Sequence, residues 1–402
     1  MPVLGYVVLL CLCAMNVAAD WSPVWTDALP GWFNYAVFDP SYPDLTVVYS
    51  YGGHNHYAVN VTTGNVLWST AANFTVSAAV RGGVLFCLTS VYVDYHLIHL
   101  YAFDAFTGNF KWTGPQIDGY DPTIVAPQGT ELLIVLTNVA VYAVNGSSGN
   151  MVWSFQDVDY PQYFGVMDGV VSVASADSLY GVDLNSGASL WQVNVSGYIT
   201  LTTPSKGIVT YQRGTMFYVD AIDVFTGKVK QWAALNTTNT TAGNVFYDAP
   251  NKAVVVLMNT SSFYSSLAFD STSGVQVAMT NDIMPYPEDW YECVAGLCIY
   301  YTNPYPMQNL VAVNYMTGSL MWNVTVPIQD GTQSTSVTYM RPNLIIITGT
   351  SDESAAVVLG VDPTSGKFWT LDIGQENAYL LQQRSSSQVL VGSIEILVLA
   401  NV

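Results

Sequence analysis

Positive charge is scarce in this 402-residue chain, which carries 10 Lys and Arg against 29 Asp and Glu, for a formal net charge of −19. So few cationic side chains cannot form the basic surface that follows a phosphate backbone, and the composition excludes a nucleic-acid-binding protein. The same imbalance argues against binding to an anionic membrane surface. Disorder is excluded as well, because 50% of the residues are hydrophobic and 13% are aromatic.

Long apolar runs are also missing, since no segment beyond residue 19 has the roughly 18 uninterrupted apolar residues that span a bilayer. Residues Val3–Val17 are apolar and uncharged, and the sequence ending at Ala19 places small residues where signal peptidase recognises them. We predict a signal peptide over 1–19, with an uncleaved anchor as the alternative. The mature chain, 20–402, is then a single domain without membrane insertion, secreted or in the lumen of the secretory–lysosomal pathway.

Cysteines are few, and two of the five, Cys11 and Cys13, lie in the predicted signal peptide. Cys293 and Cys298 flank a predicted tight turn between two strand-like runs, where opposite residues come close enough for a disulfide. We predict this bridge, with two buried thiols as the alternative. Cys87 is expected to be a buried free thiol.

Export is also supported by eight Asn-X-Ser/Thr sequences. N-linked glycans would suit a chain that is apolar and poor in charge. Two of these asparagines, Asn60 and Asn145, belong to the repeat motif described next, which can make them inaccessible to glycosylation. The predicted glycosylation sites are the other six: Asn73, Asn194, Asn236, Asn239, Asn259 and Asn323.

One motif recurs along the whole chain: an Asp or Asn stands four residues before a Gly, and a Trp usually follows the Gly by three to five residues. The glycines are 38 to 48 residues apart, and such a period indicates a repeat architecture. The four closest copies are Asn60, Gly64, Trp68; Asp104, Gly108, Trp112; Asn145, Gly149, Trp153; and Asp183, Gly187, Trp191. The looser copies are Asp223, Gly227, Trp232; Asp270, Gly274, Ala278; Asn314, Gly318, Trp322; and Asp362, Gly366, Trp369.

Each repeat has room for four short strands. In the second repeat we expect strands A to D at 76–80, 84–89, 98–104 and 109–113, from their β-branched and aromatic residues and the Gly, Asn and Asp between them. No segment has a convincing helical period. Four strands in a period of roughly 40–50 residues are typical of β-propeller blades. The predicted fold is therefore an all-β propeller of eight to nine blades.

The two ends complete this scheme. Val24 and Trp25 match the D strand of the other repeats, and the C-terminal residues 378–400 supply only strands A, B and C. We predict eight complete repeats and one blade split between the termini, an arrangement that removes open sheet edges.

The residue types of the motif have structural reasons. Gly tolerates a positive φ at the C–D turn, and the Asp or Asn side chain can accept backbone N–H bonds from that turn. The Trp ring is expected to pack between neighbouring blades.

The pattern Ala-X-Asp-X-X-Thr-Gly-X-X-X-Trp, best kept in Ala102–Trp112, resembles the tryptophan-docking motif of the PQQ-like repeat family. This family includes quinoprotein alcohol dehydrogenases and the propeller lipoprotein of the bacterial outer-membrane assembly machinery. The resemblance covers residues 20–402 and implies a β-propeller, commonly of eight blades.

Catalysis does not follow from this resemblance. Quinoprotein dehydrogenases hold pyrroloquinoline quinone (PQQ) with cationic side chains and a calcium ion, typically beneath a disulfide of adjacent cysteines. The mature chain has no adjacent cysteine pair, and it lacks the long insertions of those enzymes. We name no catalytic residue and keep a PQQ-dependent oxidoreductase as the alternative function. The arginines are dispersed: Arg81, Arg213, Arg341 and Arg384.

Histidines and carboxylates offer two candidate metal sites. His-X-His and His-X-X-His spacings can ligate a metal, but the register puts His56 and His99 on opposite sides of their strands, so we expect His54, His56, His96 and His99 to be loop and surface residues. Acidic residues in the D–A connections would hold Ca²⁺ or a cationic ligand if they converge, and are solvated loops otherwise. The candidates are Asp118, Asp121, Asp157, Asp159, Asp289 and Asp330.

The longest irregular connection, 281–292, contains Trp290 between acidic residues and suits a contact with a partner. Our leading hypothesis is a secreted or lumenal glycoprotein whose propeller is a non-enzymatic scaffold for a protein or small-molecule ligand. A Ca²⁺-binding secreted module is a further alternative.

Overall fold

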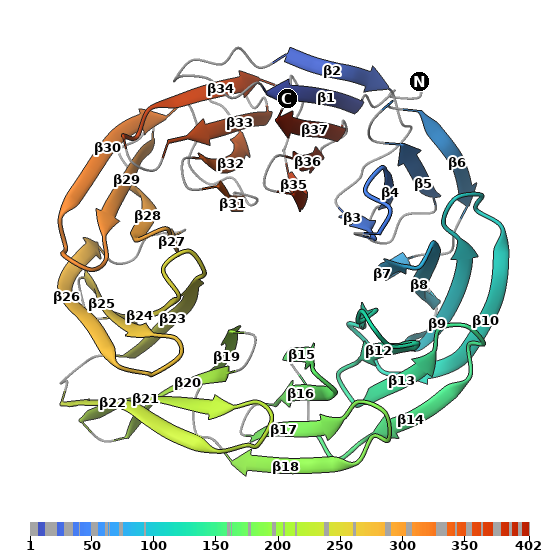
Figure 1. Ribbon diagram of the computed structural model, residues 1–402, viewed down its shortest axis with the longest axis horizontal. Helices are drawn as coiled ribbons and strands as arrows, with labels where there is room; N and C mark the ends of the chain where they lie inside the picture. Colours follow the sequence, from blue (N-terminus) through green and yellow to red (C-terminus); the bar gives the residue numbers. More distant parts are fainter. Residues whose placement is uncertain are drawn as a thin grey trace. The chain divides into compact units, whose positions relative to one another are not determined.

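The structure is a computed structural model. It describes residues 7–12, 22–27, 35–39, 41–49, 55–60, 63, 65–71, 75–91, 94–158, 161, 163–175, 178–194, 198–203, 206–213, 215–236, 241–259, 263–285, 291–302, 308–326, 336–341, 344–350, 356–362, 365–372, 379–385, 388–392 and 396–401. The elements in these residues are all β-strands, which form nine sheets (Figure 1). The chain divides into two compact units, which are described separately below.

The first unit holds five sheets, four of them formed by consecutive antiparallel strands. These are β3 Tyr35–Phe38, β4 Leu45–Tyr49, β5 Asn55–Asn60 and β6 Val66–Ala71; β7 Thr75–Arg81, β8 Val84–Val91, β9 Asp94–Asp104 and β10 Phe110–Asp118; β11 Thr123–Val125, β12 Leu132–Leu136, β13 Val141–Asn145 and β14 Met151–Phe155; and β31 Ser336–Arg341, β32 Leu344–Thr350, β33 Ala356–Val361 and β34 Phe368–Asp372. The fifth joins β1 Val7–Leu12 and β2 Ser22–Asp27 to β35 Tyr379–Ser385, β36 Gln388–Gly392 and β37 Ile396–Asn401.

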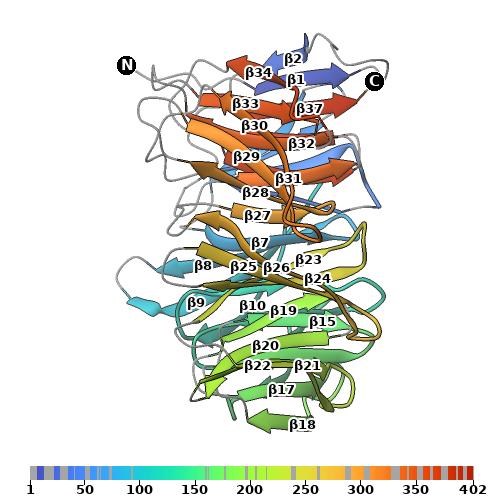
Figure 2. The ribbon, with the colours of Figure 1, turned by 90° about the vertical axis from the view of Figure 1, so that its left-hand side faces the viewer.

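The second unit holds four sheets of four antiparallel strands, which Figure 2 shows from the side. They are β15 Tyr163–Met167, β16 Val170–Ala174, β17 Ser178–Asp183 and β18 Ser189–Asn194; β19 Tyr198–Thr203, β20 Lys206–Arg213, β21 Met216–Asp223 and β22 Val229–Asn236; β23 Thr241–Asp248, β24 Ala253–Asn259, β25 Phe263–Asp270 and β26 Gln276–Pro285; and β27 Tyr291–Val294, β28 Leu297–Thr302, β29 Gln308–Asn314 and β30 Leu320–Val326.

Within each unit, neighbouring sheets contact each other through their first strands. In the first unit these contacts run from β31 to β35, β3, β7 and β11, and in the second from β15 to β19, β23 and β27. The expected four-strand repeat is confirmed in eight of the nine sheets, and the ninth, which both ends of the chain share, has five strands. In the second repeat the strands are β7 to β10, which include the ranges predicted for A to D apart from the first residue of D.

A β-bulge recurs between the third and fourth strands of most repeats, and the Gly-to-Trp spacing accounts for it. Ala58 pairs with Trp68 but Val59 pairs with Val66, so one residue of β6 is extra. In β34 the spacing is one residue shorter, and Gly360 pairs with Trp369 without a register shift. The extra residue adds local twist to the outer strand.

Both ends of the chain share one sheet, as the repeat pattern predicts, but with a different strand order. We expected β2 to lie next to β37. Instead, β1 pairs parallel with β37, and β2 pairs antiparallel with β1. The predicted signal peptide thus supplies a strand in the uncleaved chain, and its removal remains a prediction.

The core lies between the sheets. Successive residues of a strand face opposite sides of the sheet, and both faces of the inner strands are buried. In β12 and in β16 all five residues are buried. Leu133 and Ile134 are both 0% exposed. Burial on both faces explains why these strands are continuous apolar runs in the sequence.

Candidate functional site

The motif Asp binds its own turn. Asp183 Oδ1 accepts hydrogen bonds from the backbone N–H groups of Asn185 and Ser186, at 3.1 and 2.8 Å, and from the Ser186 hydroxyl at 2.8 Å. These bonds lower the pKa of Asp183, with the Ser186 hydroxyl as the largest cause. Seven other motif residues make the same kind of turn: Asn60, Asp104, Asn145, Asp223, Asp270, Asn314 and Asp362.

The motif Gly receives the Trp of the preceding sheet. A Cβ on Gly108 would lie 2.9 Å from the Trp68 ring, and one on Gly149 would lie 2.7 Å from the Trp112 ring. Trp68 also donates from Nε1 to the carbonyl of Ala105 at 2.9 Å. The same docking joins Trp191 to Gly227, Trp232 to Gly274, and Trp322 to Gly366.

One repeat lacks the Trp, and another side chain fills the space. Ala278 stands at the Trp position of β26, and a Cβ on Gly318 of the next sheet would lie 2.5 Å from Thr280 Cγ2. The motif residue Gly64 lies outside the described residues, whereas Trp153 is buried and Gly187 has a positive φ.

Buried polar residues at the A–B turns connect neighbouring sheets. Asp39, 1% exposed, follows β3 and accepts a hydrogen bond from the backbone N–H of Gly82 in the next sheet. Arg81 ends β7 and contacts the next sheet, β11–β14. Its Nη1 donates to the carbonyls of Leu132 and Pro127, at 2.7 and 3.0 Å. The Arg81 guanidinium thus binds backbone carbonyls within the fold.

Asp248 makes the most complete of these connections. It is 0% exposed, and its Oδ1 and Oδ2 accept the backbone N–H groups of Ala295 and Gly296 at 3.0 and 2.6 Å. Oδ2 also accepts the Tyr315 hydroxyl at 2.7 Å and the Asn251 amide at 2.8 Å. Burial raises the pKa of Tyr315, and the hydrogen bond to Asp248 is a second cause that acts in the same direction. A buried carboxylate with four donors is a structural group.

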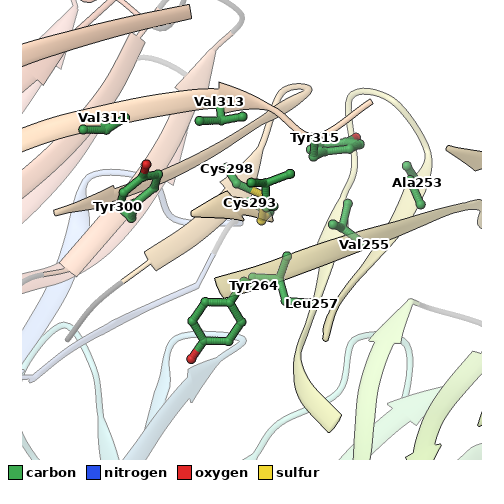
Figure 3. Packing of buried hydrophobic residues seen from close by; sticks show 12 residues of the cluster. Ala253, Val255, Leu257, Tyr264, Cys293, Cys298, Tyr300, Val311, Val313 and Tyr315 are labelled. Atoms are coloured by element: carbon green, nitrogen blue, oxygen red, sulfur yellow. A yellow bond between two sulfur atoms is a disulfide. The ribbon is translucent and has the colours of Figure 1, made fainter. Parts of the chain in front are cut away.

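The turn that receives Asp248 is held by a disulfide. Cys293 and Cys298 lie opposite each other in β27 and β28 and are bonded, with their Cα atoms 4.1 Å apart. Between them Ala295 and Gly296 both have positive φ, as in the primed turns of hairpins. Figure 3 shows the bridge among the buried side chains of this cluster, including Val255, Tyr300 and Val313.

His56 is a core residue, contrary to our expectation of a surface histidine. It is 1% exposed, and its Nε2 lies 2.9 Å from Thr75 Oγ1 and 3.9 Å from Cys87 Sγ. Its Nδ1 is buried without a hydrogen-bond partner. Burial lowers the pKa of His56 to about 4 and raises the pKa of the Cys87 thiol, so both groups are neutral at pH 7.

The other histidines do not join this group in the described residues. His99 is partly exposed and lies beside Tyr101, with 6.2 Å between ring centroids. His54 and the side chain of His96 lie outside the described residues.

The acidic loop candidates are exposed where they are described. Asp118 and Asp121 flank Tyr120, whose backbone N–H donates to Asn138 Oδ1 at 2.7 Å, so this connection is fastened to the next B–C turn. Asp157 is also exposed. Asp159, Asp289, Trp290 and Asp330 lie outside the described residues. The irregular connection predicted at 281–292 is shorter than expected, because 281–285 belong to β26 and 291–292 belong to β27. Within the described part of the chain, no three His, Cys, Asp or Glu side chains gather to hold a metal ion.

The two arginines whose side chains are described form no evident site for a quinone cofactor. PQQ carries three carboxylates and needs cationic partners, but Arg81 donates to backbone carbonyls and Arg213 is exposed. The side chains of Arg341 and Arg384 lie outside the described part of the chain.

Three predicted glycan acceptors are exposed on outer strands: Asn194 in β18, Asn236 in β22 and Asn323 in β30. Asn145 Oδ1 accepts two turn N–H groups and Asn60 Oδ1 accepts that of Thr63, which agrees with their structural role. Asn73, Asn239 and the side chain of Asn259 lie outside the described residues.

One residue departs from the repeat in a chemically distinct way. The position three residues before the motif Asp or Asn is occupied by Tyr57, Tyr101, Tyr142, Tyr180, Leu267, Val311 and Leu359 in seven repeats, but by Asp220 in the fifth. Asp220 Oδ2 accepts the Tyr211 hydroxyl at 3.0 Å, whereas its Oδ1 is buried without a hydrogen-bond partner. Asp220 was not among the predicted site residues, although its repeat position can be read from the sequence.

Solved structures show the fold. The Dos1 propeller is 12% identical, with a TM-score of 0.53 and 90% of each chain covered. Sqt1 of Chaetomium thermophilum, bound to the N-terminus of ribosomal protein L10, is 11% identical, with a TM-score of 0.52 and 92% and 96% covered. The dihydro-heme d1 dehydrogenase NirN is 9% identical, with a TM-score of 0.52 and 83% and 74% covered. The fold is a β-propeller.

Among curated proteins no sequence matches this chain. In the residues described, no helix has the length and apolar character needed to cross a membrane. The model of the family described as outer membrane protein assembly factor BamB matches residues 18–158 and 123–324. With its PQQ-like repeats matched over most of its length, the chain belongs to the BamB family of β-propellers.

Proposed function

We propose that this chain is a secreted or lumenal glycoprotein whose propeller is a non-enzymatic scaffold for binding a protein or another ligand. The observation that carries this proposal is how the described polar residues of the repeat are used. Motif aspartates such as Asp183 bind their own turns, and buried aspartates at the A–B turns, such as Asp248, bind the next sheet. A rigid framework whose recurring polar residues hold the fold together leaves function to the surface and loops.

The neighbours support a binding role without specifying a ligand. Sqt1 has the same fold and was solved bound to the N-terminus of ribosomal protein L10. Its low identity carries only the fold to this chain, so the partner here is a separate question.

The connection between β26 and β27, which contains Trp290, provides the test of binding. The secreted chain and a Trp290→Ala variant are compared for partners captured by cross-linking in the medium and lumen of the producing cells. A Phe110→Ala variant is the matched control, because Phe110 is 58% exposed on an outer strand. We expect Trp290→Ala, but not Phe110→Ala, to lose a partner. Unchanged capture by Trp290→Ala would reject this contact surface.

Export and glycosylation are tested on the same material. We expect an N-terminus at Asp20 and a mass that falls after enzymatic removal of N-glycans. A protein retained in the cell with its first 19 residues, or one without glycan mass, would contradict this part of the proposal.

Two alternatives have their own tests. A PQQ-dependent oxidoreductase would show saturable quinone binding and dye reduction when PQQ and Ca²⁺ are added. A Ca²⁺-stabilised module would melt at a higher temperature with Ca²⁺. The scaffold proposal expects neither response.

A further inference from the structure

Asp220 is placed where a carboxylate is unusual for this fold. The equivalent residues Tyr57, Tyr142, Tyr180, Leu267 and Val311 are at most 8% exposed, so this position belongs to the packing between sheets. A charged side chain in such a place costs free energy unless it is paired.

The surroundings of Asp220 are aromatic and apolar. Strands β20 and β21 pair here, with Val209 opposite Asp220 and Tyr211 opposite Tyr218. The two tyrosine rings are stacked, with centroids 4.9 Å apart and planes 10° from parallel. On this side the β19–β22 sheet packs against the β15–β18 sheet, where Leu179 and Val209 share one cluster.

The carboxylate is only half satisfied. Tyr211 donates to Oδ2, while Oδ1 is buried and receives no hydrogen bond. Burial raises the pKa of Asp220, and the bond from Tyr211 acts against this effect. The side chains of Asp220 and both tyrosines are partly exposed, whereas Oδ1 itself is buried, so a ligand reaches Oδ1 only when the side chains that cover it move.

From this geometry we propose that Asp220, Tyr211 and Tyr218 form a binding site for a cationic nitrogen group, an alkylammonium or a guanidinium. Such a group donates to the unpartnered Oδ1 with a charge-assisted bond, and its charge offsets the burial of the carboxylate. The stacked tyrosines add cation–π attraction. The net charge of −19 raises the local concentration of cations.

Two sources carry this chemistry: a free amine, or a Lys or Arg side chain of a partner protein. The inference rests on the proposed scaffold function only in the second case. The probes are therefore methylguanidinium chloride, and a blocked Ala-Ala-Arg-Ala-Ala peptide with Ala-Ala-Gln-Ala-Ala as its neutral control.

Calorimetric titration of the full chain tests the site. We expect saturable binding of at least one cationic probe and none of the Gln peptide. Asp220→Asn should weaken binding about tenfold or more, since it removes the negative charge from a charge-assisted hydrogen bond. Asp220→Tyr restores the residue of four other repeats and should fold well while losing binding. Asp168→Asn, an exposed carboxylate in the same unit, removes equal charge and should bind normally.

The outcomes distinguish failure of the cation-binding site from failure of the scaffold function. Binding of methylguanidinium alone assigns the site to a free amine, and binding of the Arg peptide assigns it to a partner side chain. No saturable binding of either probe, or equal binding by wild type and Asp220→Asn, would overturn the proposal. A captured protein partner that is indifferent to Asp220→Asn would leave the scaffold function standing and reject a partner side chain as the ligand of this site.

Discussion

Aspartate has two opposite roles in this chain. Asp183 lies at an exposed turn, where hydrogen bonds to the ionised form lower its pKa. Asp248 is fully buried, and its charge is spread over four donors from two sheets. The same residue type thus shapes a turn in one place and fastens neighbouring blades in another.

Asp248→Asn tests the buried role. The amide keeps one acceptor but leaves N–H donors without a charged partner, so we expect the free energy of unfolding to fall by about 1–3 kcal/mol. Asp168→Asn, at an exposed turn, should change it by less than about 0.5 kcal/mol. Urea unfolding measures both. Equal effects of the two substitutions would show that Asp248 is not a structural group.

His56 makes stability depend on pH. Its pKa is 6.5 in the unfolded chain and about 4 in the fold, so between these values the unfolded chain binds a proton that the folded chain does not. Stability is therefore full above about pH 6.5 and falls by up to about 3 kcal/mol as the pH decreases to about 4. Tyr49 and Cys87, which face His56, have raised pKa values and stay neutral in this range.

The measurement compares urea unfolding at pH 7, 6 and 5 for wild type, His56→Gln and His99→Gln. His56→Gln should lower stability at pH 7 but lose part of the decrease between pH 7 and 5. His99→Gln should keep the wild-type slope. A His56→Gln slope identical to wild type would contradict the assignment.

At the scale of the element, the docking of a Trp on the Gly of the next sheet connects the sequence to the fold. The spacing of the motif predicts the four strands and the tight turn. It also accounts for the bulge, because a strand with one residue fewer between Gly366 and Trp369 pairs without a register shift. The Trp ring, the tight turn at the Gly and the β-bulge thus depend on one another through the spacing of the motif.

Gly274→Ala tests this docking against a matched glycine. Both Gly274 and Gly129 have positive φ, at 72° and 75°, so alanine strains the backbone similarly. A Cβ on Gly274 would lie 2.1 Å from Trp232, whereas nothing lies within 4 Å at Gly129. We expect Gly274→Ala to destabilise the protein by about 1–3 kcal/mol more than Gly129→Ala. Equal melting temperatures would contradict docking.

The sequence was sufficient for the propeller, its strands and its repeating turns, because these follow local periodicity. It was not sufficient for contacts between repeats. Asp248 meets Ala295 across 47 residues, and no local pattern marks that pairing. His56 was misjudged for the same reason, since its burial comes from Thr75 and Cys87 of the next repeat. Asp220 was detectable only by asking which repeat position it occupies.

At the scale of the whole molecule, both ends of the uncleaved chain build one sheet. β37 has two neighbours in this sheet, β36 and the N-terminal strand β1. The parallel pairing of Val7–Leu12 with Ile396–Asn401 satisfies the outer edge of β37. Without N-terminal strands, that edge would expose unpaired backbone groups.

Hydrogen exchange measured by mass spectrometry tests this claim directly, on the uncleaved chain of residues 1–402 and on a chain that lacks residues 1–27. We predict slow exchange of β36 and β37 in the full chain and much faster exchange in the shortened one, with β12 and β13 unchanged as the internal control. Equal protection of β37 in both chains would contradict a sheet shared by the two termini.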